Sequence, residues 1–359
     1  MFPAYSRQLP AMRKAFHAIF IQAGSILLIT TPFVSFSQGN LQKKDYKQMV
    51  LSVAYFIESA NNSINSLNGL LKKDNYRNKI TTLNNPSNNE LGFSLKTEIL
   101  AALQPLLAKA KKTDNSKFRE VIENLLSNPD ENGLSSVKQY LPAAGIFSAV
   151  ISLVGSLVIS EKRITKDDLN QFTAKVMQYF NQYEKLNEIN EQFTRQSQNL
   201  LERIEENKQD LKDFLTECVC TFHRSMTKQS VKEMPAELLI QKYYDPQKLQ
   251  AWLDTMKFKP DMVIFPPDAP TSIKLLTSDI KKLQKEFEQV YNDNYNALKE
   301  LITSLKNTIP NLDQNQLDKT NAELNRLYTE SRQADLINLN INQVDERMNT
   351  ACGIINAYY

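Results

Sequence analysis

The stretch from Thr165 to Ser230, TKDDLNQFTAKVMQYFNQYEKLNEINEQFTRQSQNLLERIEENKQDLKDFLTECVCTFHRSMTKQS, contains neither proline nor glycine. Apolar and aromatic side chains fill most of two positions of a seven-residue repeat along it. The first position holds Leu169, Val176, Tyr183, Asn190, Ser197, Ile204, Leu211 and Cys218, and the second holds Phe172, Tyr179, Leu186, Phe193, Leu200, Asn207, Phe214 and Thr221. The pattern predicts a helix roughly 90 Å long with one continuous packing stripe. Since such a helix cannot bury its stripe alone, the chain needs partner helices.

Three other stretches offer such partners. Lys44 to Leu71 and Ser272 to Ile309 carry apolar residues at three- and four-residue steps, and so does Leu312 to Ala357. Only eight glycines occur in 359 residues, and helix-favouring residues predominate. The sequence therefore predicts an all-α protein: an elongated antiparallel bundle of long, coiled-coil-like helices with a small helical cap and one apolar helix. Coiled coils between chains are the alternative.

Proline and asparagine clusters separate these stretches into seven regions. Val231 to Thr271 holds six of the fourteen prolines, which block a long helix there. The predicted division is a signal peptide at 1–37, a first long helix at 38–73, a cap at 74–140, an apolar helix at 141–160, the long coiled-coil helix at 161–230, a proline-rich crossover at 231–271 and C-terminal long helices at 272–359.

The N-terminus predicts export. Arg13 and Lys14 precede a mainly apolar run from Ala15 to Phe36, and small residues lie just before Gln38. This order of a basic region, an apolar region and a cleavage site is typical of a secretory signal peptide. We therefore expect an exported protein that is periplasmic, on the cell surface or secreted.

The segment Leu141–Ser160, LPAAGIFSAVISLVGSLVIS, lies in an uncharged run between Lys138 and Glu161. As a helix it would reach roughly 28 to 30 Å, close to the thickness of the bilayer hydrocarbon. Its apolar surface, and thus its predicted membrane contact, comprises Ile146, Phe147, Val150, Ile151, Leu153, Val154, Leu157, Val158 and Ile159. Small residues at a four-residue interval, Ala144, Ser148, Ser152 and Ser156, form a predicted helix-packing face.

Signals for catalysis, cofactors and nucleic acid are weak. The charge is nearly balanced, with 43 basic and 40 acidic residues, so we expect no nucleic-acid partner. The only histidines are His17 and His223, and no serine-hydrolase elbow, zinc helix, paired-cysteine motif or phosphate loop is present. We expect no enzyme, no cofactor, no metal site and no small-molecule substrate. A site made only of carboxylates leaves no local signature and stays open.

Three cysteines, Cys218, Cys220 and Cys352, are present. In an oxidising compartment a disulfide is the expected use. Cys218 lies on the packing stripe of the long helix and is the preferred partner of Cys352, if the last helix packs antiparallel to the long one.

In its architecture the chain resembles the α-helical pore-forming toxins of the cytolysin A and haemolysin BL type. The resemblance lies in an exported, cysteine-poor helical chain with long heptad-bearing helices and one apolar segment between them. It implies that 144–159 is the membrane-entering element, that Thr165 to Ser230 is the adjoining long helix, and that the partners are membrane lipid and further copies of the chain. This chain departs from those proteins in offering barely one apolar helix where they usually have two apolar limbs.

The leading functional prediction is a secreted membrane-active helical protein that forms pores by release of 141–160 and oligomerisation. Two alternatives remain open. One is a non-enzymatic extracytoplasmic structural or interaction protein in which this helix stays buried. The other is a single-span membrane protein with 141–160 as the span.

Overall fold

The fold is all-α, as predicted, and no strand occurs among the residues that the structure describes. The computed structural model describes residues 42–72, 74–109, 112–127, 143–160, 164–259, 265–266, 268–332 and 334–358. The helices are α2 (Lys43–Lys72), α3 (Asn75–Leu83), α4 (Leu95–Lys109), α5 (Lys112–Ser127), α6 (Ala143–Ser160), α7 (Lys166–Phe222), α8 (Lys228–Lys232), α9 (Ala236–Leu239), the π-helix η1 (Ile240–Tyr244), α10 (Pro246–Thr255), α11 (Ala269–Thr308), α12 (Gln314–Arg332) and α13 (Ala334–Tyr358).

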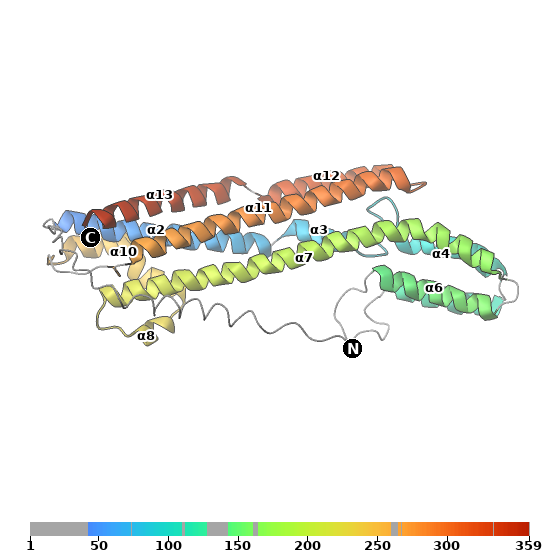
Figure 1. Ribbon diagram of the computed structural model, residues 1–359, viewed down its shortest axis with the longest axis horizontal. Coiled ribbons are helices and arrows are strands. Elements are labelled where there is room, and N and C mark those ends of the chain that lie inside the picture. The colour runs from blue at the N-terminus through green and yellow to red at the C-terminus, as the bar shows by residue number, and fades with distance from the viewer. Residues whose placement is uncertain are drawn as a thin grey trace, which may run out of the picture. The chain divides into compact units, whose positions relative to one another are not determined.

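The two longest helices, α7 and α11, lie antiparallel along most of their lengths (Figure 1). Arg203 near the middle of α7 pairs with Glu286 of α11. Gln182, nearer the start of α7, donates a hydrogen bond to Thr308 Oγ1 at the end of α11 at 3.2 Å. Most residues of the predicted stripe on α7 are buried, and they include Phe193, Leu200, Ile204 and Leu211. Residues at helical spacing on α11 are buried as well, and they include Ile280, Leu283, Phe287 and Leu298. The heptad stripe thus forms part of the bundle core.

Two interrupted helices complete the bundle. The first consists of α2 and α3. They run antiparallel to α7, and thus parallel to α11, because Phe56 of α2 packs on Phe214 while Tyr76 of α3 packs on Phe193. The second consists of α12 and α13, which run back antiparallel to α11, and Lys281 pairs with Asp345 of α13 at 2.5 Å. Residues Gln42–Ala357 form one compact unit.

The turn between α3 and α4 is fixed to the turn between α11 and α12. The N–H of Asp313 donates to the carbonyl of Gly92 at 2.9 Å. Gly92 has a φ of 82°, and a Cβ there would lie 2.7 Å from the Asp313 carbonyl oxygen. Any other residue would be strained at this positive φ, and its Cβ would clash with Asp313. Glycine at position 92 therefore allows the two turns to approach this closely. Thr320 of α12 adds a hydrogen bond to the carbonyl of Glu90 at 2.6 Å.

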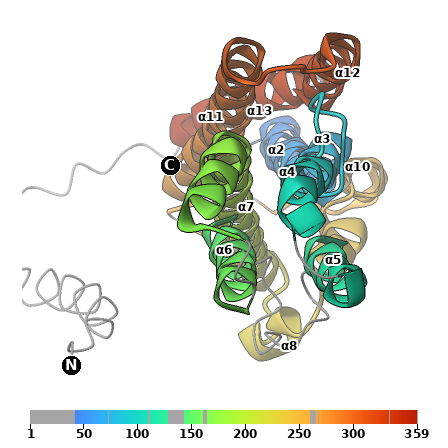
Figure 2. The same cartoon turned by 90° about the vertical axis from the view of Figure 1, so that its right-hand side faces the viewer.

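Different elements cover the two ends of α7. Its N-terminal part contacts α4 and α6, and Figure 2 shows α6 below α7 and α5 below α4. Its C-terminal part contacts the short helices α8 and α9 of the crossover. Pro246 is the first residue of α10, where its missing N–H costs no helical hydrogen bond, and Asp245 caps that helix.

The predicted regions can be compared with these bounds. The long helix predicted to reach Ser230 ends at Phe222, because the chain turns at His223 before α8. The last predicted helix is divided into α12 and α13.

The predicted signal peptide, 1–37, lies outside the described residues. Among the residues that the structure describes, no helix combines the length and the apolar character needed to cross a membrane.

Candidate functional site: the apolar helix α6 and its interface with α7

The candidate site is the surface that α6 shares with the N-terminal part of α7. Helix α6 covers Ala143–Ser160 and contains no charged residue. Its many β-branched residues disfavour helix weakly, so we expect packing against α7 to supply much of its stability.

The buried side of α6 is a short apolar stripe. Val150 and Val154 lie one turn apart, and both are fully buried. Phe147 precedes Val150 on the same side, and its ring lies 4.6 Å from the ring of Phe180, edge to face at 67°. Phe180 and Val176 of α7 are themselves buried. We call the surface formed by these five residues the α6 interface. Each buried valine contributes about 1.5–3 kcal/mol to it.

The opposite side of α6 is small and polar. Ser148, Ser152 and Ser156 follow each other at four-residue steps, and all three are exposed. Ser156 Oγ donates to the carbonyl oxygen of Leu153 in its own helix at 2.6 Å. No hydrogen bond or ion pair joins a described α6 side chain to another helix. The α6 interface is therefore made of apolar contacts.

The residues predicted to contact membrane fall into three groups. Val150 and Val154 are buried on the side of α6 that carries Phe147, whereas Phe147, Ile151 and Leu153 are half-buried. The side chains of Ile146, Leu157, Val158 and Ile159 lie outside those that the structure describes, as does that of Ala144 from the predicted helix-packing face. The serines predicted as a helix-packing face point to solvent, so packing of this face against another helix stays a prediction.

The start of α7 is fixed independently of α6. Thr165 caps the helix: its Oγ1 accepts from the Asp168 N–H at 3.2 Å, and the Thr165 N–H donates to Asp168 Oδ2 at 2.9 Å. Lys109 Nζ at the end of α4 bonds Asp168 Oδ1 at 2.6 Å. The hydrogen bond from Lys109, supported by those from Thr165, lowers the pKa of Asp168 to about 2. Departure of α6 would therefore leave this end of α7 capped and joined to α4.

Cys218 and Cys352, predicted as a disulfide pair, are both free thiols in the structure. They face different neighbours. Cys218 is fully buried against Tyr244, and burial raises the pKa of its thiol well above the usual range. Cys352 lies 3.5 Å from the carbonyl oxygen of Pro270. Cys220, which is half-buried, is also free.

The surroundings of His223 do not resemble a catalytic relay. Its ring lies between those of Phe222 and Tyr243, at 4.8 and 5.1 Å. Burial, with the nearby charge of Lys242, lowers its pKa. Within the described ranges, no group of three or more His, Cys, Asp or Glu residues is arranged to hold a metal ion.

Comparison with protein-family models, curated proteins and solved structures finds no match to this chain. Its function must therefore be argued from its own residues.

Two features of this site were missed in the sequence. Phe180 follows Tyr179 and falls outside the two heptad positions that define the stripe, yet it holds Phe147. The buried face of a helix often includes a third apolar position per seven-residue repeat, and a search for that position would have pointed to Phe180. The link between Lys109 and Asp168 joins residues 59 positions apart, so no local pattern could have indicated it.

Proposed function

We propose that the protein is membrane-active, and that α6 leaves its interface with α7 so that its apolar surface enters lipid. Several copies then act together to permeabilise the bilayer. The observation that carries the proposal is that α6, a helix with no charged residue, has no described hydrogen bond or ion pair to another helix and contacts α7 through apolar side chains such as Phe147.

The energetics favour an exchange of this kind. Leaving α7 exposes Val150, Val154 and Phe147, which costs several kcal/mol in water. Lipid is about as apolar as the α7 surface, so entry into a bilayer recovers most of that cost. No described hydrogen bond or ion pair between α6 and another helix has to be broken, and a helix satisfies most of its own backbone donors and acceptors in lipid. The exposed serines can bond to carbonyls of their own helix, as Ser156 already does.

Ser152 offers a direct test because it is exposed while α6 lies on α7. The variant Ser152→Asp should fold normally. On entry into lipid, however, the new carboxylate would have to move into apolar surroundings, at a cost of up to about 2.5–3.5 kcal/mol. The matched control is Ser278→Asp on the exposed side of α11. We expect dye release from anionic vesicles by the wild type and by Ser278→Asp, and release at least tenfold slower for Ser152→Asp.

A fluorescent probe then reports where α6 lies. Ser152→Cys, made with Cys220→Ser and labelled with an environment-sensitive dye, should shift to shorter wavelength on vesicle binding, whereas a label at Ser278→Cys should not. Equal release by the two aspartate variants would refute the proposal. So would a wild type that neither binds nor permeabilises zwitterionic or anionic vesicles at pH 7 or pH 5, a result that favours the structural or interaction protein.

A further inference from the structure

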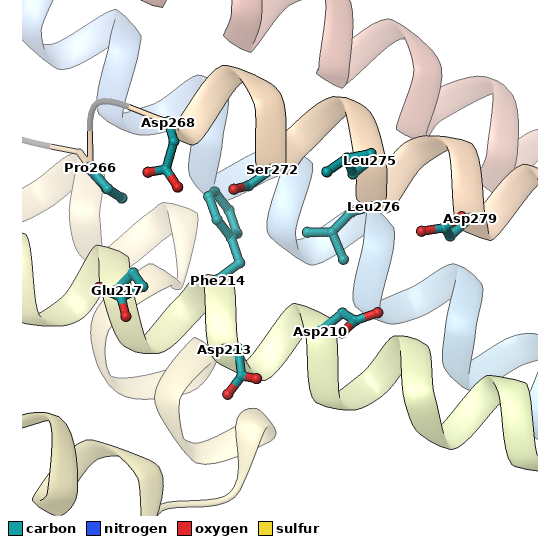
Figure 3. A pocket seen from close by; sticks show the side chains of 10 residues that line it. All are labelled: Asp210, Asp213, Phe214, Glu217, Pro266, Asp268, Ser272, Leu275, Leu276 and Asp279. Carbon is teal, nitrogen blue, oxygen red and sulfur yellow. The ribbon is translucent and has the colours of Figure 1, made fainter. Parts of the chain in front are cut away.

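A groove far along α7 from α6 lies between the C-terminal third of α7 and the first turns of α11. It has a volume of about 350 Å³. Ten residues line it: Asp210, Asp213, Phe214, Glu217, Pro266, Asp268, Ser272, Leu275, Leu276 and Asp279. Figure 3 shows these side chains on α7, on α11 and on the segment just before α11, with Phe214 and Leu276 between the acidic groups.

The floor of the groove is apolar. Phe214 and Leu276 are each 5% exposed, and they separate α7 from α11 at this level. Leu275 lies beside Leu276 at the surface and is 60% exposed, more than any other large apolar side chain that the structure describes. An exposed leucine next to a hollow with an apolar floor is typical of a surface that another apolar side chain covers.

The rim of the groove is acidic, and no Lys, Arg or His lines it. Glu217 and Asp279 have cationic neighbours outside the groove, Lys228 at 2.5 Å and Lys282 at 3.0 Å. No ion pair or hydrogen bond joins the Asp210 carboxylate to a described side chain. Burial, and then the negative charges of Asp279 and Asp213, raise the pKa of Asp210 above its usual range. The unbound groove thus holds like charges close together, and a cation would relieve their repulsion.

The spacing of these charges indicates the shape of the cation. The carboxylates are not gathered as a metal site within the described residues. Asp210, Asp213 and Glu217 follow one face of α7 over about 10 Å, and Asp268 and Asp279 span about 16 Å of α11. Two separated rows of negative charge with an apolar strip between them match an elongated partner that carries cations on both sides of an apolar ridge.

We propose that this groove binds a basic amphipathic helix of a partner protein. Leucine-like side chains of the partner cover Leu275, Leu276 and Phe214, and its lysines or arginines pair with the carboxylates on the two rims. The mode is a helix laid in a groove, with apolar anchors at three- and four-residue steps. Charge complementarity sets the orientation and the rate of association, while burial of Leu275 contributes affinity. This site is separate from the α6 interface, and the inference does not depend on membrane activity.

The test uses the full chain and a fluorescein-labelled synthetic helix built of leucine and lysine, with binding followed by fluorescence anisotropy. Asp210→Asn, Asp213→Asn and Asp279→Asn combined should weaken binding at least tenfold at low salt. Leu275→Ala should weaken it about threefold to tenfold. The matched control removes the same charge from exposed positions elsewhere on α7, with Glu184→Gln, Glu188→Gln and Glu202→Gln, and should change binding less than twofold.

Three outcomes would overturn the inference. Equal weakening by the groove triple and the control triple would mean that the peptide responds to net charge alone. An unchanged affinity for Leu275→Ala would show that the apolar floor is not covered. A wild-type chain that self-associates in sedimentation, with the groove triple monomeric, would assign the groove to a second copy rather than to a partner protein.

Discussion

The contact between α3, α7 and α11 and the contact between α6 and α7 both bury aromatic side chains, but among the described residues only the first is also held by polar groups. In the first, Tyr291 donates a hydrogen bond to buried Asp74, and Tyr76 donates to Asn294 at 2.9 Å. We call these four residues the central network. In the second, the ring of Phe147 lies on Phe180 and no described polar contact is added.

The difference bears on the proposed departure of α6 from α7. Separation of α3 from α11 would strip buried donors and acceptors of their partners, and each such group costs about 1–3 kcal/mol. Separation of α6 from α7 exposes only apolar surface, and a lipid or another apolar surface can cover it again. Among the described residues, the chain therefore combines a bundle whose helices are joined by polar as well as apolar contacts with a helix, α6, that is joined to α7 by apolar contacts.

The largest effect is expected for the central network. Asp74 caps α3 by accepting from the Tyr76 N–H at 3.0 Å, and it also accepts from Tyr291. Asp74→Ala removes both contacts and leaves the Tyr291 hydroxyl buried without its partner. We expect a loss of about 2–4 kcal/mol in the free energy of unfolding, measured by urea denaturation. Asp167→Ala, at an exposed position in the first turn of α7, is the control and should change stability far less. Equal losses would mean that the central network contributes no more to the free energy of unfolding than an exposed position does.

The α6 interface should weaken locally. Phe180 is 3% exposed and contacts Phe147, so Phe180→Ala removes the largest ring on the α7 side of this interface. We expect the local opening free energy of α6 to fall by about 3 kcal/mol, with faster hydrogen exchange in α6 and unchanged protection in α11. Met177→Ala on α7, at a position that is 36% exposed, should have a much smaller effect. A uniform increase in exchange across the bundle would contradict local attachment.

Two carboxylates should give opposite responses to acid. The pKa of Asp168 is lowered to about 2 by its hydrogen bonds, first from Lys109. Its stabilising contribution is therefore complete above the unfolded value of 3.8 and is lost as the pH falls from about 4 to 2. Burial raises the pKa of Asp74, so its protonated form is favoured in the fold, and this contribution decreases as the pH rises through the raised pKa.

Thermal unfolding between pH 2 and pH 7 separates the two groups. Asp168→Asn should flatten the decrease in melting temperature below pH 4, and Asp74→Asn should change the profile above pH 4. Asp167→Asn, for which no such contacts are described, should leave both parts unchanged. If Asp168→Asn follows the wild-type curve below pH 4, the Lys109 contact does not persist in solution.

The sequence predicted the helices more completely than it predicted how they are joined. The heptad positions from Phe172 to Phe214 identified a buried stripe, because packing repeats regularly along a helix. The connections between distant helices could not be predicted. Tyr76 and Asn294 are 218 positions apart, and neither has a local pattern that marks it as a partner. The acidic groove was missed for the same reason: Asp210 and Asp279 each belong to an ordinary helix face, and only the antiparallel packing of α7 and α11 brings them together.

The smallest expected effect concerns that groove and has the opposite sign. Although the Asp210 side chain reaches solvent, partial desolvation of its carboxylate and the like charges on Asp279 and Asp213 raise its pKa. Asp210→Asn removes one of the repelling charges with little change of shape, so we expect a slightly higher melting temperature near pH 7, by about 1 to 2 °C. The gain should shrink in 1 M salt, which screens the repulsion between exposed carboxylates. Glu188→Gln, on the same helix but away from the groove, should not raise the melting temperature. If Asp210→Asn is instead less stable, a cationic group of the same chain already pairs with Asp210 in the free protein. The groove would then be occupied by the chain itself.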